Sequence, residues 1–233
     1  MPPDSYGFRT QERRVATPGN WLLRLLNRRH NYYINNGDQI ATSNGLRFSI
    51  NRSTTGGDGT SNSKAQIAFS DPMTFGDRYI FNFDLFIPAD WIDSTEDEGC
   101  ALWSIYNTPN PGENWLSGPV TLYIMDGKLI WHVRGSADPA PRPNQRPHAQ
   151  HSSAITKGEW TSVRVEYVPD CEEGLVRIYY GGNLAFEHRG CTAYNDQRGP
   201  TFKFGLYHWK WATGVNYRRV HYRNIRVNHI GGD

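Results

Sequence analysis

Residues 120–134 have the sequence VTLYIMDGKLIWHVR. The Asp126-Gly127 pair is typical of a two-residue turn between antiparallel strands, so this stretch predicts a β-hairpin. In that register one side of the hairpin is apolar and consists of Val120, Leu122, Ile124, Leu129, Trp131 and Val133. The other side carries Thr121, Tyr123, Lys128, His132 and Arg134. A shift by one residue would bury His132 and Arg134, so hydrophobic burial fixes the register.

The same alternation recurs in other segments. On residues 201–211 the apolar side consists of Phe202, Phe204 and Leu206, and the opposite side of Lys203, Gly205, Tyr207 and Trp209. On residues 64–69 the apolar side consists of Ala65, Ile67 and Phe69, and the opposite side of Lys64 and Gln66. Phe81, Phe83, Leu85 and Ile87 share one side of a further strand. The pattern predicts an all-β antiparallel sandwich, with cationic, aromatic and amide groups lining one concave sheet.

Composition restricts the class of protein. The chain has 233 residues, and 25 Lys and Arg against 23 Asp and Glu give a net charge of +2. Aromatic residues make up 13%, enough to build a large core, which argues against a disordered chain. No apolar run is long enough to span a membrane, and the weak charge gives little reason to invoke nucleic acid. We expect residues 1–30 to form a basic arm or an end-closing segment, and residues 31–233 one β domain.

The N-terminus lacks the features of a secretory signal. We therefore expect a protein that is extracellular after loss of a leader, or associated with a virus particle. Cys171 and Cys191 flank a predicted hairpin with a Gly181-Gly182 turn, which would bring the two sulfurs within bridging range. The sequence leaves open whether they form a disulfide or stay as free thiols. Cys100 is expected to be a buried thiol. No metal site or cofactor is expected, although the acidic stretch 93–98 is either a solvated loop or a structural calcium site.

The sequence TFKFGLY at residues 201–207 resembles the Tyr-Phe-Lys-x-Gly-x-Tyr motif of the jelly-roll polysaccharide lyases, which include alginate, glucuronan and smaller heparin lyases. In the same order as in those families, residues 119–131 resemble the central hairpin, residues 157–160 a Gly-x-Trp before a strand, and residues 224–227 the closing strand. The resemblance covers about residues 45–228. It implies a concanavalin-like jelly roll with a concave groove, and cleavage of uronate-containing polymers by β-elimination.

Two segments depart from the family pattern. Residues 64–68 are KAQIA where these lyases often carry Arg-x-Glu-x-Arg, and residues 104–106 are SIY where many carry Gln-Ile-His. The usual histidine and glutamine are therefore missing, and Tyr106, His132 and Gln66 are the candidates to replace them.

Uronate β-elimination requires neutralisation of the carboxylate, a base near C5 and an acid for the departing O4. The resemblance and the direction in which the strand faces together make Tyr207 the candidate acid. The candidate bases are His132 and Tyr207 itself. The candidates for binding the carboxylate are Lys203, Arg134, Lys64 and Gln66. The candidate sugar-contacting rings are Tyr106, Tyr123, Trp209 and Trp103.

Three functions fit the sequence. The first is a lyase acting on an anionic polysaccharide. The second is a non-catalytic jelly-roll protein that decorates a virus particle or cell surface, grips glycans and assembles through its N-terminal arm. The third is a lectin-like binding domain of a larger system.

Overall fold

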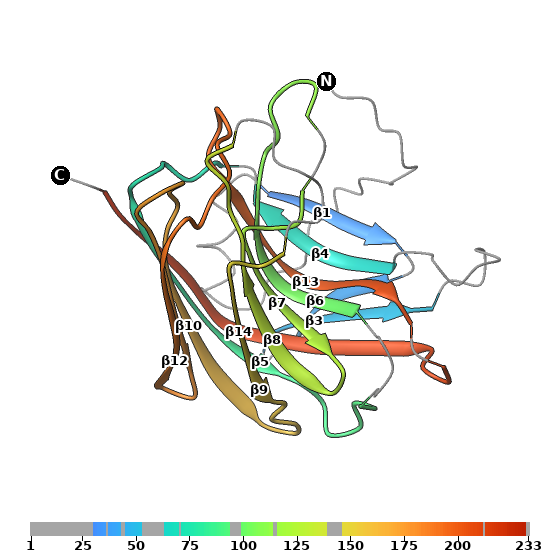
Figure 1. Cartoon of the computed structure of the whole chain (residues 1–233). Coiled ribbons are helices and arrows are strands. Elements are labelled where there is room, and N and C mark those ends of the chain that lie inside the picture. The colour runs from blue at the N-terminus through green and yellow to red at the C-terminus, as the bar shows by residue number, and fades with distance from the viewer. Residues whose placement is uncertain are drawn as a thin grey trace.

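The computed structural model of this protein describes residues 30–35, 37–42, 45–52, 63–69, 71–93, 99–113, 116–138, 146–211 and 213–231. Over this part of the chain the secondary structure is entirely β, in two seven-stranded antiparallel sheets that pack into a sandwich (Figure 1). The predicted fold class is confirmed. None of the described residues form a helix that could cross a membrane.

The first sheet has the strand order β1-β4-β13-β6-β7-β8-β9. Its strands are β1 (His30–Asn35), β4 (Ser63–Phe69), β13 (Thr201–Lys210), β6 (Gly99–Tyr106), β7 (Val120–Met125), β8 (Lys128–Val133) and β9 (Ala149–Ala154). The second sheet has the order β12-β11-β10-β5-β14-β3-β2. Its strands are β12 (Asn183–Gly190), β11 (Gly174–Tyr180), β10 (Trp160–Val168), β5 (Arg78–Phe86), β14 (Tyr217–Ile230), β3 (Gly45–Asn51) and β2 (Gly37–Thr42).

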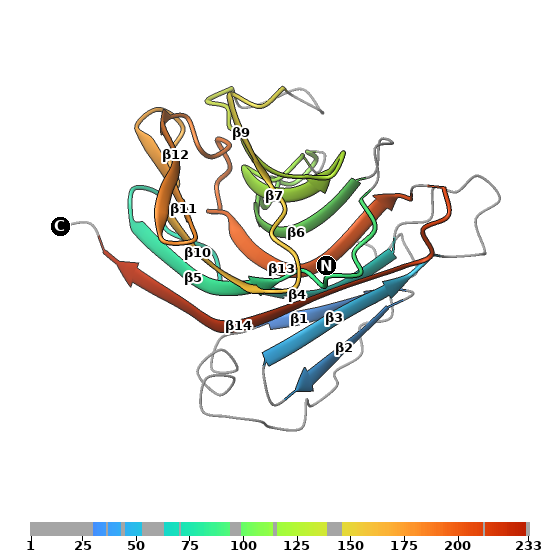
Figure 2. The same ribbon diagram turned by 90° about the horizontal axis from the view of Figure 1, so that it is seen from below.

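Both sheets are strongly curved, and the first sheet lies inside the bend of the second (Figure 2). The face of the first sheet that points away from the core therefore lies on the inner side of the curve. We call this face the polar face.

The hairpin of β7 and β8 forms in the predicted register, with Thr121 opposite His132. Asp126 and Gly127 both have positive φ angles, 49° and 69°, as a turn matching the twist of the two strands requires. All six residues predicted for the apolar side are at most 2% exposed. Hydrophobic burial thus selects the register that places His132 on the polar face.

Large aromatic side chains fill the core between the sheets. Phe48 of β3 contacts both Phe204 of β13 and Tyr222 of β14, in each case edge to face with ring centroids 5.6 Å apart. The hydroxyl of the buried Tyr222 donates a hydrogen bond to the carbonyl of Leu102, 2.7 Å away. The core therefore joins β13 and β6, the strands at the middle of the polar face, to the second sheet.

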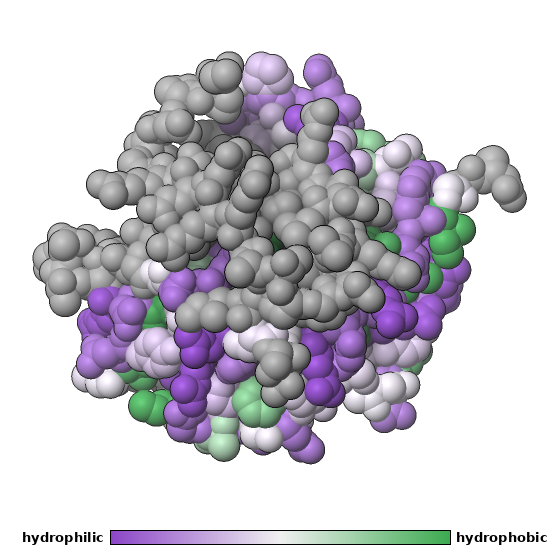
Figure 3. Space-filling model, turned by 180° about the vertical axis from the view of Figure 1, so that it is seen from behind, coloured by the Kyte–Doolittle hydropathy of each residue, from purple (hydrophilic) through white to green (hydrophobic). Residues whose placement is uncertain are grey.

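Few large hydrophobic side chains are exposed among the described residues. They are Ile92, Leu184, and Tyr217 and Ile230 at the two ends of β14. In the view from behind, the described surface is mainly hydrophilic with isolated hydrophobic residues (Figure 3). The interior rings are thus the main apolar feature of the fold.

The hairpin predicted between Cys171 and Cys191 forms as β11 and β12, with Gly181 and Gly182 in its turn. All three cysteines are free, and Cys100 is buried as predicted. Desolvation raises the pKa of the Cys171 thiol to about 11. The basic segment was expected over residues 1–30. Residues 1–29 lie outside the described part of the chain, and His30 begins β1.

Candidate active site

The first sheet has an unusual charge distribution. None of its seven strands, all within the described part of the chain, contains an aspartate or glutamate. The polar face nevertheless carries Lys64 on β4 and Lys203 on β13, and Arg134 follows directly after β8. This face therefore favours an anionic ligand, because its strands contribute cationic side chains and no carboxylate of their own.

Strand pairing places the polar-face residues in two rows across the sheet. The first row is Lys203 (β13), Ser104 (β6), Thr121 (β7), His132 (β8) and Gln150 (β9). The second row is Lys64 (β4), Tyr207 (β13), Ala101 (β6), Tyr123 (β7) and Ile130 (β8). The sequence-predicted residues of four different segments thus meet on one continuous face.

One end of this face holds what we call the Tyr207 cluster: Lys64, Lys203, Tyr106 and Tyr207. The Lys64 ammonium lies over the ring of its cross-strand partner Tyr207, 4.7 Å from the ring centroid. The Lys203 ammonium lies 4.1 Å from the centroid of the Tyr106 ring. Both contacts are within the range of a cation–π interaction, which holds each ammonium group against an aromatic ring.

Desolvation shifts the pKa values of this cluster toward the neutral forms. It lowers the pKa of Lys64, and together with the nearby Lys64 charge it lowers the pKa of Lys203 to about 8. Desolvation, with a smaller contribution from Tyr123, raises the pKa of Tyr207. Lys64 is thus more easily deprotonated than an ordinary lysine, and Tyr207 stays a protonated donor.

The other end holds the His132 cluster: His132, Arg134, Tyr123 and Gln150. Arg134 donates a hydrogen bond to Nδ1 of His132 at 2.9 Å, and a weaker one to the Tyr123 hydroxyl at 3.4 Å. Because an arginine can only donate, Nδ1 is the unprotonated nitrogen, and Nε2 donates to the Gln150 carbonyl oxygen at 3.0 Å. Desolvation and the Arg134 charge lower the pKa of His132 to about 4, so its ring is neutral at physiological pH.

Trp209 joins the two clusters. Its ring centroid lies 5.7 Å from that of Tyr207 and 5.3 Å from that of Tyr123. The strands that carry Tyr207 and His132 are separated by β6 and β7, which puts them about 14 Å apart at the usual strand spacing. The two clusters are therefore suited to contact different units of a chain-like ligand.

The structure corrects the prediction that Trp103 contacts a sugar. Trp103 is 2% exposed and lies in the core, with its ring centroid 5.3 Å from that of Phe81. Neighbouring positions of a strand alternate between its faces, so Ser104 and Tyr106 on the polar face require Trp103 to face inward. Gln66, another predicted contact, belongs to a polar-face strand but is only 2% exposed.

Sequence reasoning missed Gln150 and Ser104, and it placed Thr121 on the polar side of the hairpin without naming it a site residue. Gln150 lies on β9, whose sequence AQHSSA has no apolar alternation that would identify it as a strand. Ser104 and Thr121 have short side chains between Lys203 and His132, and both are buried. Their place between Lys203 and His132 follows from the strand register only once β6 is known to lie between β13 and β7.

Within the described residues no three His, Cys, Asp or Glu side chains are arranged to hold a metal ion. Of the acidic stretch considered for calcium, residues 94–98 lie outside the described part. Asp93 binds the ammonium group of Lys157 at 2.6 Å. The calcium alternative stays a prediction.

The fold is that of the jelly-roll lyases. A glucuronan lyase from the fungus Trichoderma reesei superposes with a TM-score of 0.69 at 16% identity, over 82% of this chain and 86% of that one. A family 7 alginate lyase gives 0.59 at 11% identity over 87% and 82%, and an alginate lyase from Pseudomonas aeruginosa gives 0.54 at 18% identity over 82% and 85%. The comparison with curated protein sequences gave no match.

A family model gives the more specific assignment. The model described as polysaccharide lyase matches residues 26–226, which is most of the chain. The protein belongs to the polysaccharide lyase family, as the motif at residues 201–207 implied.

Proposed function

We propose that the protein cleaves a uronate-containing polysaccharide by β-elimination on the polar face. The observation that carries this proposal is the Tyr207 cluster, which sets two lysines and two tyrosines on a sheet whose strands contain no carboxylate. Family membership and the similarity to glucuronan and alginate lyases support the same reaction class.

In the proposed reaction, the Lys203 ammonium neutralises the uronate carboxylate, which makes the C5 proton more acidic. A base removes that proton, the C4–O4 bond breaks, and a C4=C5 double bond forms. Tyr207 donates its proton to the departing O4. The cleavage consumes no water, because both protons are exchanged with side chains.

We assign the base to Lys64 in its unprotonated form. Lys64 is the cross-strand partner of Tyr207 and lies over its ring, so a base and an acid stand side by side; desolvation lowers the pKa of Lys64 and raises that of Tyr207. His132 and Tyr207 were the two candidate bases from the sequence. Both ring nitrogens of His132 are hydrogen-bonded, and His132 lies about 14 Å from Tyr207 by strand spacing. We therefore assign His132, with Arg134, to binding a neighbouring sugar unit.

The proposal is tested by incubating the protein with alginate, glucuronan, heparin and hyaluronan and following the ultraviolet absorbance of the unsaturated uronate product. We expect the absorbance to rise with at least one polymer. Lys64→Arg retains the positive charge but cannot be deprotonated, so it should abolish the signal. Absence of product with all four polymers would disprove the lyase proposal.

A second candidate function is binding without cleavage. The hydrogen bonds that occupy both nitrogens of His132, and the SIY sequence in place of Gln-Ile-His, favour it. A non-catalytic protein would be retarded by an acidic polymer in affinity electrophoresis, yet release no unsaturated product.

The role of Lys203 predicts how ligand binding depends on pH. The Lys203 ammonium is present below its pKa of about 8 and is lost above it. A bound carboxylate stabilises the ammonium, so the affinity of a uronate tetrasaccharide for the Tyr207→Phe variant should fall as pH rises beyond about 8. Loss of a charged hydrogen bond predicts a decrease of about tenfold or more, measurable by calorimetry.

Lys203→Arg is the matched control, because arginine keeps its charge throughout this range. We expect its affinity to change little between pH 7 and pH 10. An equal decrease in both proteins would show that Lys203 does not hold the carboxylate.

A further inference from the structure

A second polar surface lies on the outer side of the second sheet. Register aligns Tyr179 (β11), Arg164 (β10), Asn82 (β5) and Arg226 (β14) in one row across four strands. An open depression of about 700 Å³ follows this row, with Ser162 and Asn228 also in its lining. We call it the outer-sheet site.

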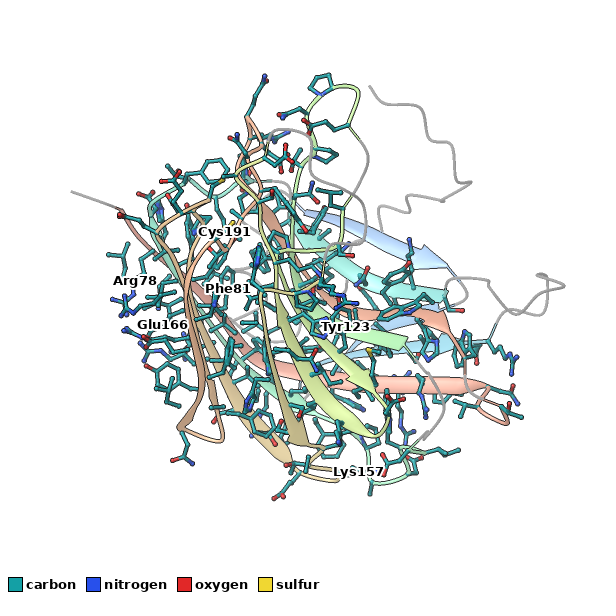
Figure 4. The ribbon with its side chains drawn as sticks, viewed as in Figure 1. Arg78, Phe81, Tyr123, Lys157, Glu166 and Cys191 are labelled. Carbon is teal, nitrogen blue, oxygen red and sulfur yellow. The ribbon has the colours of Figure 1, made fainter. Side chains whose placement is uncertain are left out.

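The outer-sheet site lies on the opposite side of the sandwich from the polar face. In Figure 4, Arg78 and Glu166 lie together at the outer side of the second sheet, Tyr123 lies on the first sheet, and Phe81 lies between them in the core. A short ligand held by the Tyr207 cluster therefore cannot reach the outer-sheet site.

Positive charge is in excess around this depression. Glu166 is buried beneath three arginines: it pairs with Arg78, with Arg164 at 2.6 Å and with Arg177 at 3.6 Å. Glu187 is shared between Arg177 at 2.5 Å and Arg189 at 2.8 Å. Each of these carboxylates is thus outnumbered by the guanidinium groups around it.

Nearer the middle of the depression, the arginines again outnumber the carboxylate. Asp84 is neutralised by Arg223 at 2.9 Å and accepts a further hydrogen bond from Asn224 at 2.7 Å. Arg226 is exposed and forms no ion pair among the described residues. The ion pairs in and beside the depression thus contain five arginines and three carboxylates, and Arg226 adds a sixth arginine, whereas the net charge of the entire chain is +2.

The other lining groups suit sugars better than nucleobases. Asn82, Asn228 and Ser162 offer amide and hydroxyl groups that both donate and accept hydrogen bonds, as sugar hydroxyls require. The lining ring, Tyr179, is covered by the Arg164 guanidinium, 5.4 Å from the ring centroid, so it offers little free surface for base stacking.

We propose that the outer-sheet site binds a second segment of the acidic polysaccharide without cleaving it. The proposal rests on the proposed function, since it takes the same polymer as its ligand. A long chain, or a second chain of a polymer network, would then contact the protein at two separate places. The two contacts would raise the affinity for polymer through effective concentration and leave the affinity for short fragments unchanged.

The test compares polymer and fragment binding in the Tyr207→Phe background. Arg164→Ala/Arg226→Ala should weaken binding to glucuronan in affinity electrophoresis by roughly tenfold, and should leave calorimetric binding of a glucuronate tetrasaccharide unchanged. Arg219→Ala is the matched control: it removes one arginine from β14 that pairs with Asp90 away from the depression, and we expect no change in either measurement.

Four results would overturn the proposal, and only the last would also overturn the proposed function. Equal glucuronan affinity of the double variant and its parent would show that the outer-sheet site contributes nothing. An equal loss of tetrasaccharide binding would show that the site is not separate from the polar face. Tighter binding of double-stranded DNA than of glucuronan, lost in the double variant, would assign the surface to nucleic acid. A parent that neither binds nor cleaves any acidic polymer would instead overturn the proposed function as well.

Discussion

Tyr207→Phe should reduce lyase activity by about a hundredfold to ten-thousandfold, the usual contribution of a positioned acid or base. The substitution removes the proton that the proposed reaction transfers to O4 and leaves the ring beneath the Lys64 ammonium in place. The measurement is the rate of ultraviolet absorbance increase on the preferred polymer. The tetrasaccharide should still bind, because Lys203, which holds the carboxylate in the proposed reaction, is unchanged.

The fold should survive this substitution. The Tyr207 hydroxyl forms no hydrogen bond to another described residue, so its removal leaves no buried group unsatisfied. The free energy of unfolding should therefore change by no more than about 0.5 kcal/mol. Tyr217→Phe is the matched control, because Tyr217 is 45% exposed at the start of β14, on the other sheet. Full activity of the Tyr207 variant, or equal loss in the control, would remove Tyr207 from its proposed role.

The sequence predicts the sandwich because side-chain alternation is a local property. The hairpin of β7 and β8 has its turn residues and both of its faces within 15 residues, so burial alone selects one register. The same reasoning gives the inward side of β5 and β13 correctly. It misses β9, which has polar residues on both faces and becomes a strand through its pairing with β8.

The candidate site is less predictable, because it depends on which distant strands become neighbours. Lys64 and Tyr207 are 143 positions apart in the chain and meet only because β4 pairs with β13. Nothing in either segment encodes that β6 and β7 separate Tyr207 from His132, which is why the sequence alone groups them as one acid–base pair. The hydrogen bond that His132 donates to Gln150 depends on the same kind of long-range pairing.

Trp103→Ala should destabilise the protein by about 3–5 kcal/mol, as replacement of a fully buried large aromatic residue by alanine usually does. Trp103 packs against Phe81, Phe83 and Trp131, with ring centroids 5.3, 6.2 and 5.9 Å away. Its removal takes away those contacts and leaves a cavity between the two sheets. Urea denaturation, followed by circular dichroism, measures the change as a lower midpoint.

Trp209→Ala separates this structural role from a role in binding. Trp209 is only partly buried on the polar face, where it contacts Tyr207 and Tyr123, so its loss should weaken tetrasaccharide binding and cost much less stability. Loss of Trp103 is thus expected to lower mainly the stability, and loss of Trp209 mainly the sugar affinity, although both were candidate sugar-contacting residues from the sequence. A Trp103 variant with unchanged stability and weakened sugar binding would show that its ring, contrary to the packing described, reaches the polar face.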